Sequence, residues 1–193
     1  MGRPREFDTE AALATAEELF WRNGYDGTSL SDLTKAMGIV PPSFYFAFKS
    51  KEALFERVLE RYRAERMGYV EAALNEPTAR CVAERILYAL IDSQTDPRCP
   101  PGCLAINNAL PAAGTNDPVR LMVAEVRRDL QSRLESRFRQ AVQEGDLGKD
   151  ADPEMLARFI LTVAWGMAIE AQSGTTRAQL RATAAMALKA WPA

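Results

Sequence analysis

Two cysteines carry the most reactive side chains of this sequence. Cys99 and Cys103 flank Pro100-Pro101-Gly102, a composition that predicts a loop. Two thiols at this spacing could form a disulfide, react with an electrophile or bind a soft metal such as Cu(I). A zinc site would lack ligands, because the chain contains no histidine. Redox, electrophile or metal sensing through Cys99 and Cys103 is therefore one hypothesis, and we expect no resident metal.

The missing histidine also bears on catalysis. Histidine is the commonest general base in enzymes, and no other set of nucleophile, base and orienting group is apparent in the sequence. An all-α thiol oxidoreductase that uses Cys99 and Cys103 as a redox pair is the enzymatic alternative. We expect instead that the protein is not an enzyme and needs no cofactor.

The stretch from Thr28 to Leu54 predicts two short helices around a tight turn, followed directly by a longer helix. Thr28 and Ser29 are N-cap residue types, and apolar residues then recur at helical spacing. Gly38 ends the first helix, and Pro41 and Pro42 suit the start of the second because they have no backbone N–H to lose. This arrangement is a helix-turn-helix, whose second helix lies in the DNA major groove. A helix-turn-helix with a purely structural role is the alternative.

The residue pattern of this region is specific. It reads G-Y-x-x-T-S-L-x-D-L from Gly24 to Leu33, then M-G-I, then S-F-Y-x-x-F-K-S-K-E-A-L from Ser43 to Leu54. It resembles the DNA-binding domain of the tetracycline-repressor (TetR) family of bacterial transcriptional regulators. The resemblance implies an all-α fold with an N-terminal helix-turn-helix domain and a C-terminal helical domain for effector binding and dimerisation.

The resemblance also implies which residues contact DNA. Phosphate contacts fall on the start of the first motif helix, on the recognition helix and on the lysine of K-E-x-L, which here are Thr28, Ser29, Ser43, Tyr45 and Lys51. Hydroxyls and N–H groups at helix N-termini suit phosphate oxygens, and lysine supplies positive charge. We expect Lys49 to extend the same stripe of contacts.

Base contacts are expected from the first turn of the recognition helix and its neighbours. The residues are Pro41, Pro42, Ser43, Phe46 and Ser31. None is an arginine, asparagine or glutamine that could form a bidentate contact with a base. We therefore expect apolar contacts with thymine methyl groups and recognition of DNA shape.

The charge of the chain does not by itself indicate nucleic acid. The formal net charge is −2, so DNA affinity must come from the placement of charges. Arg3 and Arg5 lie on a short N-terminal arm that Pro4 keeps from being helical. Such an arm either enters the minor groove or is a frayed terminus, and we predict a DNA contact.

Hydrophobic periodicity predicts about nine helices and no strand. We expect a DNA-binding domain at residues 1–50 and an effector-binding and dimerisation domain at 51–193, with 51–74 as one long linking helix. The last two helices are rich in alanine and contain Gly166, so we expect them to form a homodimer. No signal peptide or membrane-spanning stretch is evident, which predicts a cytoplasmic protein without membrane contact.

A small-molecule effector is expected to bind the middle helices. Apolar and amide side chains there are the candidates for its pocket: Tyr88, Leu104, Asn107, Asn108, Met122, Phe159, Trp165 and Met167. The leading hypothesis is a homodimeric regulator, most simply a repressor, that leaves a palindromic double-stranded DNA operator when the effector binds. The effector, the operator and the sign of regulation stay open.

Overall fold

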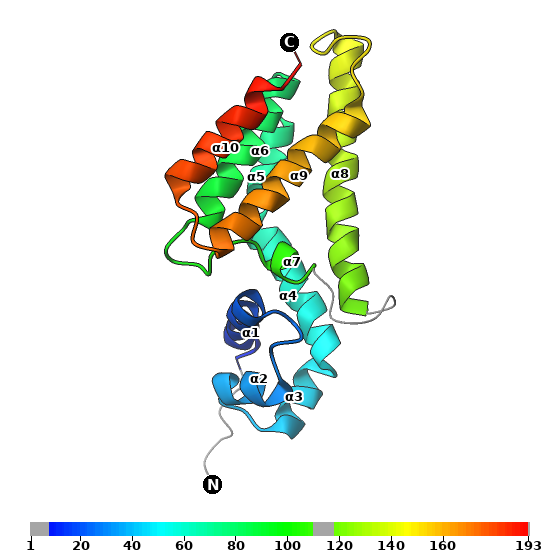
Figure 1. Ribbon diagram of the computed structural model, residues 1–193. Helices are drawn as coiled ribbons and strands as arrows, with labels where there is room; N and C mark the ends of the chain where they lie inside the picture. The colour runs from blue at the N-terminus through cyan, green and yellow to red at the C-terminus, as the bar shows by residue number, and fades with distance from the viewer. Residues whose placement is uncertain (1–7, 110–117, 193) are drawn as a thin grey trace.

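The structure is a computed structural model that describes residues 8–109 and 118–192. These residues form ten helices and no strand, which confirms the all-α prediction. Arg3 and Arg5 lie outside the described residues. Figure 1 shows α1, α2 and α3 at one end, α4 leading away from them, and a bundle of longer helices at the other end.

The N-terminal unit consists of α1 (Thr9–Asn23), α2 (Leu30–Met37) and α3 (Pro41–Phe48). Asp8 caps α1 by accepting hydrogen bonds from the backbone N–H groups of Glu10 and Ala11. Gly38 ends α2 in the left-handed conformation (φ 67°, ψ 32°), as predicted from the sequence. The aromatic rings of Phe20, Phe44, Phe48 and Phe55 lie buried between these helices and α4.

The predicted linking helix is broken in two. The structure has α4 (Lys51–Arg66) and α5 (Gly68–Leu74), with Met67 between them at φ −101° and ψ 12°. This bridge conformation is sparsely populated, and glycine at the next position disfavours continuation of the helix. The break explains why the structure has ten helices where the sequence predicted nine.

The C-terminal bundle contains α6 (Ala79–Gln94), α8 (Pro118–Glu144), α9 (Pro153–Gln172) and α10 (Arg177–Lys189). Side-chain caps begin three of these helices, from Thr78, Asp152 and Thr176. Leucine, isoleucine, valine and alanine side chains from all four helices form one buried cluster with α5. Burial of this apolar surface is the main stabilising contribution to the bundle.

A second buried cluster crosses between the two ends of the molecule. It joins α1, α3 and α4 with Leu104 and Ala105 of α7 (Leu104–Asn107) and with Val119, Val123 and Val126 of α8. We refer to it as the N-terminal cluster. Because it continues past residue 50 and recruits helices of the C-terminal half, the domain boundary predicted at residues 50 and 51 stays a prediction.

Candidate nucleic-acid interface

The first helix of the motif, α2, begins with a reciprocal capping box. The Ser29 hydroxyl accepts from the Asp32 N–H at 3.1 Å, and the Ser29 N–H donates to an Asp32 carboxylate oxygen at 2.9 Å. The Ser29 hydroxyl also donates to that carboxylate, and these hydrogen bonds lower the pKa of Asp32. Ser29 and Ser31 are both exposed at this helix start.

Thr28 does not belong to this surface. Its side chain is fully buried, and its hydroxyl donates to the carbonyls of Gly24 at 2.8 Å and Leu19 at 3.3 Å. Its backbone N–H donates to the Tyr25 carbonyl. Both donors of Thr28 are thus bonded within the chain, and this geometry contradicts the predicted phosphate contact through Thr28. The residue fixes the turn between α1 and α2 instead.

The recognition helix α3 has one buried face and one exposed apolar face. Phe44 and Phe48 are buried, with their ring centroids 5.4 Å apart, and anchor the helix in the N-terminal cluster. Phe46 is 92% exposed and Tyr45 is 51% exposed. Pro41 and Pro42 are exposed and Ser43 is half-buried at the helix start. Val40, the N-cap of α3, is also 61% exposed, so several large apolar side chains of this helix face solvent together.

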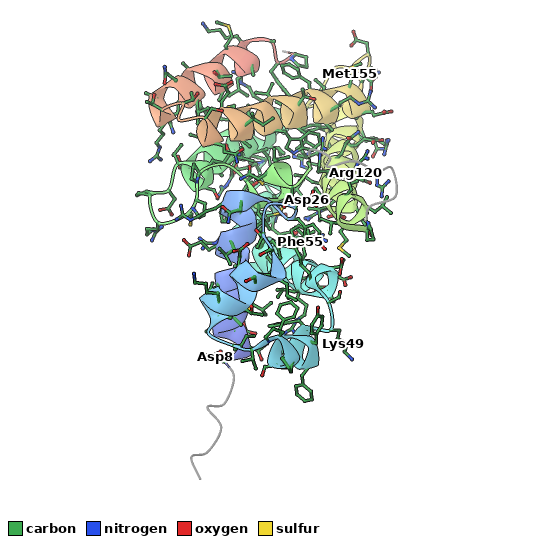
Figure 2. The ribbon with its side chains drawn as sticks, turned by 60° about the horizontal axis from the view of Figure 1, so that its bottom comes forward. Asp8, Asp26, Lys49, Phe55, Arg120 and Met155 are labelled. Atoms are coloured by element: carbon green, nitrogen blue, oxygen red, sulfur yellow. The ribbon has the colours of Figure 1, made fainter. Side chains whose placement is uncertain are left out.

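Two lysines flank the recognition helix. Lys49 ends α3 with a positive φ of 69°, and its side chain is exposed. Lys51 opens α4, with its ammonium nitrogen 4.0 Å from the centroid of the Tyr25 ring. Figure 2 places Lys49 and Asp8 at the same end of the molecule, far from Met155. The structure therefore gathers the predicted DNA-contacting residues that it describes, apart from Thr28, at one end.

Arg57 is a residue of this surface that the sequence reasoning missed. With Thr9, Pro42, Ser43, Phe46 and Ala47 it lines a hollow beside the exposed face of α3. Its guanidinium carbon lies 5.3 Å from the centroid of the Phe48 ring. The spacing of Arg57 from Phe48 and Lys51 could have indicated this position, because α4 follows α3 almost immediately.

Comparison with known proteins identifies the family. The family model "Bacterial regulatory proteins, tetR family" matches residues 12–58, and "Tetracyclin repressor-like, C-terminal domain" matches residues 84–191. The chain belongs to the TetR family. It is therefore a DNA-binding transcriptional regulator with a helix-turn-helix, as the sequence motif predicted.

Relatives and solved structures agree with this assignment. The chain is 34% identical to the HTH-type transcriptional repressor ComR of Escherichia coli (strain K12), over 99% of this chain and 92% of ComR. It is 31% identical to the repressor BdcR of the same organism, over 96% of this chain and 90% of BdcR. A cysteine mutant of the TetR-family regulator CifR, solved with 26-bp operator DNA, is 38% identical with a TM-score of 0.92. That match covers 99% of this chain and 100% of the CifR chain.

The predicted effector residues of this TetR-family chain do not converge on one place. Tyr88, Phe159, Trp165 and Met167 belong to the C-terminal bundle, whereas Leu104 and Met122 lie in or against the N-terminal cluster. The Tyr88 and Trp165 rings are covered by the guanidinium groups of Arg181 and Arg127. Asn107 and Asn108 hydrogen-bond to α1. The predicted pocket stays a prediction.

A separate groove lies between α4, α5 and α8. It has a volume of about 470 Å³, and its lining combines Met67, Val70, Val126 and Leu130 with the charged residues Arg63, Asp129, Arg133 and Glu71. A neighbouring hollow between α4 and α8 includes Met122. This groove crosses the break at Met67, so a molecule bound in it would touch both halves of the linking segment.

The two cysteines of the predicted thiol pair lie beside the N-terminal cluster. Cys99 and Cys103 are free and half-buried. The Tyr62 hydroxyl of α4 donates to the Cys103 sulfur at 3.4 Å, and burial, reinforced by Cys103, raises the pKa of Tyr62 well above its usual range. Cys103 immediately precedes α7, so a change at its sulfur would be felt by both α4 and α7.

No metal-binding cluster of three or more histidine, cysteine or carboxylate side chains occurs in the described part of the chain. None of its helices is both long and apolar enough to cross a membrane.

Proposed function

We propose that this TetR-family regulator is a homodimeric repressor that binds a palindromic operator and is released by a small molecule bound among its C-terminal helices. The observation that carries the DNA-reading part is the exposed apolar face of α3, with Phe46 92% exposed. Family membership favours a regulator over the thiol oxidoreductase. Because its ligand would be bacterial DNA, we place the protein in the cytoplasm.

In this proposal, the structure shows the conformation that binds the operator. Its similarity to the operator-bound CifR mutant, with a TM-score of 0.92, supports this interpretation. Ser29, Ser43, Tyr45, Lys49 and Lys51 contact phosphates, and Arg3 and Arg5 enter the minor groove. Ser31, Pro41, Pro42 and Phe46 meet base edges, with thymine methyl groups as the main apolar partners.

The homodimer forms through α9 and α10. Their outer surface carries the exposed apolar side chains Met155, Ile169 and Met186. Gly166 of α9 is exposed too, and a Cβ atom added there would meet no atom within 4 Å of the chain itself. Open space at an exposed glycine lets a partner backbone approach closely. A dimer also supplies the two recognition helices that a palindromic site requires.

The test of operator binding is a fluorescence-anisotropy titration against DNA from upstream of the protein's own gene, with scrambled DNA as the control. We expect tight binding to the upstream DNA only, weakening as salt rises. Phe46→Ala should lower affinity for that DNA by about tenfold, the loss of one good base contact, while the buried-face control Phe44→Leu tests folding. Equal binding of both DNAs by the wild-type chain would contradict the proposal.

Thiol sensing is the second candidate function, favoured by the hydrogen bond from Tyr62 to Cys103. Among similar proteins, CifR was solved as cysteine mutants and Escherichia coli NemR in a reduced form. In this version an oxidant or electrophile modifies Cys103 or links it to Cys99, and the operator is released. Unchanged release by hydrogen peroxide and by N-ethylmaleimide in the Cys99→Ser, Cys103→Ser double variant would eliminate it.

A further inference from the structure

The contact between α7 and α1 joins the two ends of the molecule through side-chain amides. Figure 1 shows α7 against α1, below the bundle. Asn107 ends α7 and Asn108 follows it, and Asn108 is only 8% exposed. Asparagine is rarely buried without a structural reason, since its amide must replace every hydrogen bond that it made to water.

The asparagine pair bonds to the end of α1. The last four carbonyls of a helix have no partner within the helix. Asn107 donates to the carbonyl of Trp21 at 3.0 Å, and Asn108 donates to the carbonyl of Phe20 at 3.2 Å. The Asn108 oxygen accepts from the Tyr25 N–H at 2.6 Å. Gly24, the C-cap of α1, also donates its N–H to the Phe20 carbonyl at 3.1 Å, so the asparagine pair reinforces this local cap from more than 80 positions away in the sequence.

The orientation of the Asn108 amide is fixed by α7 itself. Its nitrogen also donates to the Leu104 carbonyl at 2.8 Å, one turn earlier in the chain. Nitrogen and oxygen of this amide therefore face opposite kinds of partner, two carbonyls and one N–H. A carboxylate at this position would keep the acceptor but place a second oxygen against two carbonyl oxygens.

The turn that receives these bonds leads directly into the helix-turn-helix. The Tyr25 carbonyl accepts from the Thr28 N–H, and the next residue, Ser29, caps α2. The Tyr25 ring packs on Phe20 and Phe55 and lies under the Lys51 ammonium group. A shift of Asn108 relative to α1 would therefore move the residues that set α2 and the start of α4.

The opposite end of α7 is held by the bundle. The Gly102 N–H donates to the Gln94 carbonyl at the end of α6. Gly102 has φ 83°, and a Cβ atom added to it would lie 3.0 Å from the Ala168 carbonyl of α9. The segment before α7 is thus packed closely against α6 and α9, which ties this end of α7 to the bundle.

We propose that Asn107 and Asn108 are positioning residues for operator binding. They hold the end of α1, and with it α2 and α3, in a position that is set by the helices of the C-terminal bundle. This inference rests on the proposed operator binding. It assigns the asparagine pair to transmission between the two ends of the molecule, in place of the effector contacts predicted from the sequence.

DNA fragments that the wild-type protein enriches from a random library are first selected. The test then compares the affinities of three isosteric variants for these fragments. Asn108→Asp should weaken binding to the enriched fragment by about tenfold, the equivalent of one or two lost hydrogen bonds, and leave binding to scrambled DNA unchanged. Asn107→Asp should give a smaller loss, since it affects a single bond. Asn75→Asp is the matched control, because Asn75 makes a similar amide-to-carbonyl bond to Glu71 far from α1, and should change nothing.

The folded fraction of each variant is measured by circular dichroism, and titrations are made where it is complete. A loss shared equally by enriched and scrambled DNA would overturn the inference, since a misplaced recognition helix should affect the enriched sequence most. Wild-type affinity in folded Asn108→Asp would overturn it too. If Asn108→Asp does not fold, Asn107→Asp decides by the same criteria. Failure of the wild-type protein to enrich any fragment would instead overturn the proposed operator binding.

A spectroscopic measurement separates positioning from general destabilisation. The chain has three tryptophans, so 5-fluorotryptophan labelling gives three 19F resonances. The carbonyl of Trp21 accepts the Asn107 bond, whereas Trp165 and Trp191 belong to the bundle. Both aspartate variants should move the Trp21 resonance and leave the other two in place. An unmoved Trp21 resonance in both variants would overturn the proposal.

Discussion

Beside the apolar packing of the N-terminal cluster, two polar contacts of opposite character lie between the helix-turn-helix end and the bundle. At α7, buried amides bond to the backbone of α1. Along α8, beyond the valines buried in the N-terminal cluster, exposed ion pairs line the groove: Arg63 of α4 pairs with Asp129 at 3.1 Å, and Glu71 of α5, on the bundle side, pairs with Arg133. The first contact consists of directional hydrogen bonds shielded from solvent, whereas the second consists of charged groups in contact with solvent.

The difference teaches which contact can transmit a position. A buried amide pays the full desolvation cost if its partners move away, so it tolerates little displacement. An exposed ion pair is screened by water and salt and contributes between zero and about 1 kcal/mol. We therefore expect α7 to fix the geometry of α1, while the ion pairs of α8 tolerate small movements of the two sides of the groove.

The largest expected effect comes from the apolar anchor of α7. Leu104 is fully buried in the N-terminal cluster, so Leu104→Ala should lower the free energy of unfolding by about 2–5 kcal/mol. Urea denaturation measures this value. Leu121→Ala, at an exposed position of α8, is the control and should change it by less than about 0.5 kcal/mol. Similar values for both variants would show that Leu104 does not anchor α7.

A smaller effect is expected at Thr28, inside the turn that the asparagine pair fixes. Thr28→Val keeps the shape but removes the hydroxyl bonds to Gly24 and Leu19, at a cost of about 1 kcal/mol in unfolding free energy. The salt dependence of DNA binding should not change, because the hydroxyl faces inward. A shallower salt dependence would mean that Thr28 contacts phosphate after all.

Glu17 of α1 offers an intermediate case between the buried amides and the exposed ion pairs. It is 6% exposed, and Arg61 and Arg66 lie 3.8 and 3.9 Å from its two carboxylate oxygens. Burial raises the pKa of Glu17, and the two arginines only partly offset this. The folded protein therefore binds the proton more tightly than the unfolded chain does.

The sign of the pH dependence follows from this raised pKa. The contribution of Glu17 to stability is fully present below the unfolded pKa and is lost as the pH rises through the higher folded pKa. Glu17→Gln should remove this decline and leave the variant more stable than wild type at neutral pH. Thermal unfolding between pH 4 and about 8 measures both curves. Parallel curves for the two proteins would contradict the assignment.

The smallest effect is expected at the ion pair across the groove. Asp129→Asn removes the partner of Arg63, and both side chains are nearly half exposed. The variant should lose less than about 1 kcal/mol in dilute buffer and nothing measurable at high salt. A loss that persists at 1 M sodium chloride would show that the α8 contact is as rigid as the α7 contact.

Local signals in the sequence predicted most of the fold. Ser29 caps α2 as its residue type indicated, and Gly38 ends the same helix. These features depend on neighbours within one turn, so the sequence alone contains them. The break at Met67 was missed, because a continuous hydrophobic pattern across it outweighed the low helix propensity of Gly68.

Long-range contacts were beyond local reasoning. The burial of Thr28 depends on the carbonyl of Leu19, and the bonds of Asn107 and Asn108 to α1 span 83 to 88 positions. Amide side chains look alike at a ligand pocket and at a helix end, and only the fold distinguishes the two. Phe46 is exposed, whereas Phe44 and Phe48, two positions to either side, are buried, and the base contact predicted for Phe46 stays a prediction.

The composition of the N-terminal cluster has an evolutionary consequence. Leu104 of α7 and the valines of α8 complete the packing around α1 and α4, so the DNA-reading end is not a self-contained cassette. A hybrid protein joined at residues 50 and 51 would combine α1 of one parent with α7 of another. The side chains that pack between these two helices would then no longer match. The exposed face of α3 touches none of this packing. Single substitutions on this face can therefore change operator preference without disturbing the packing. A recombination event that exchanges the helix-turn-helix domain, by contrast, must also exchange α7 and the beginning of α8.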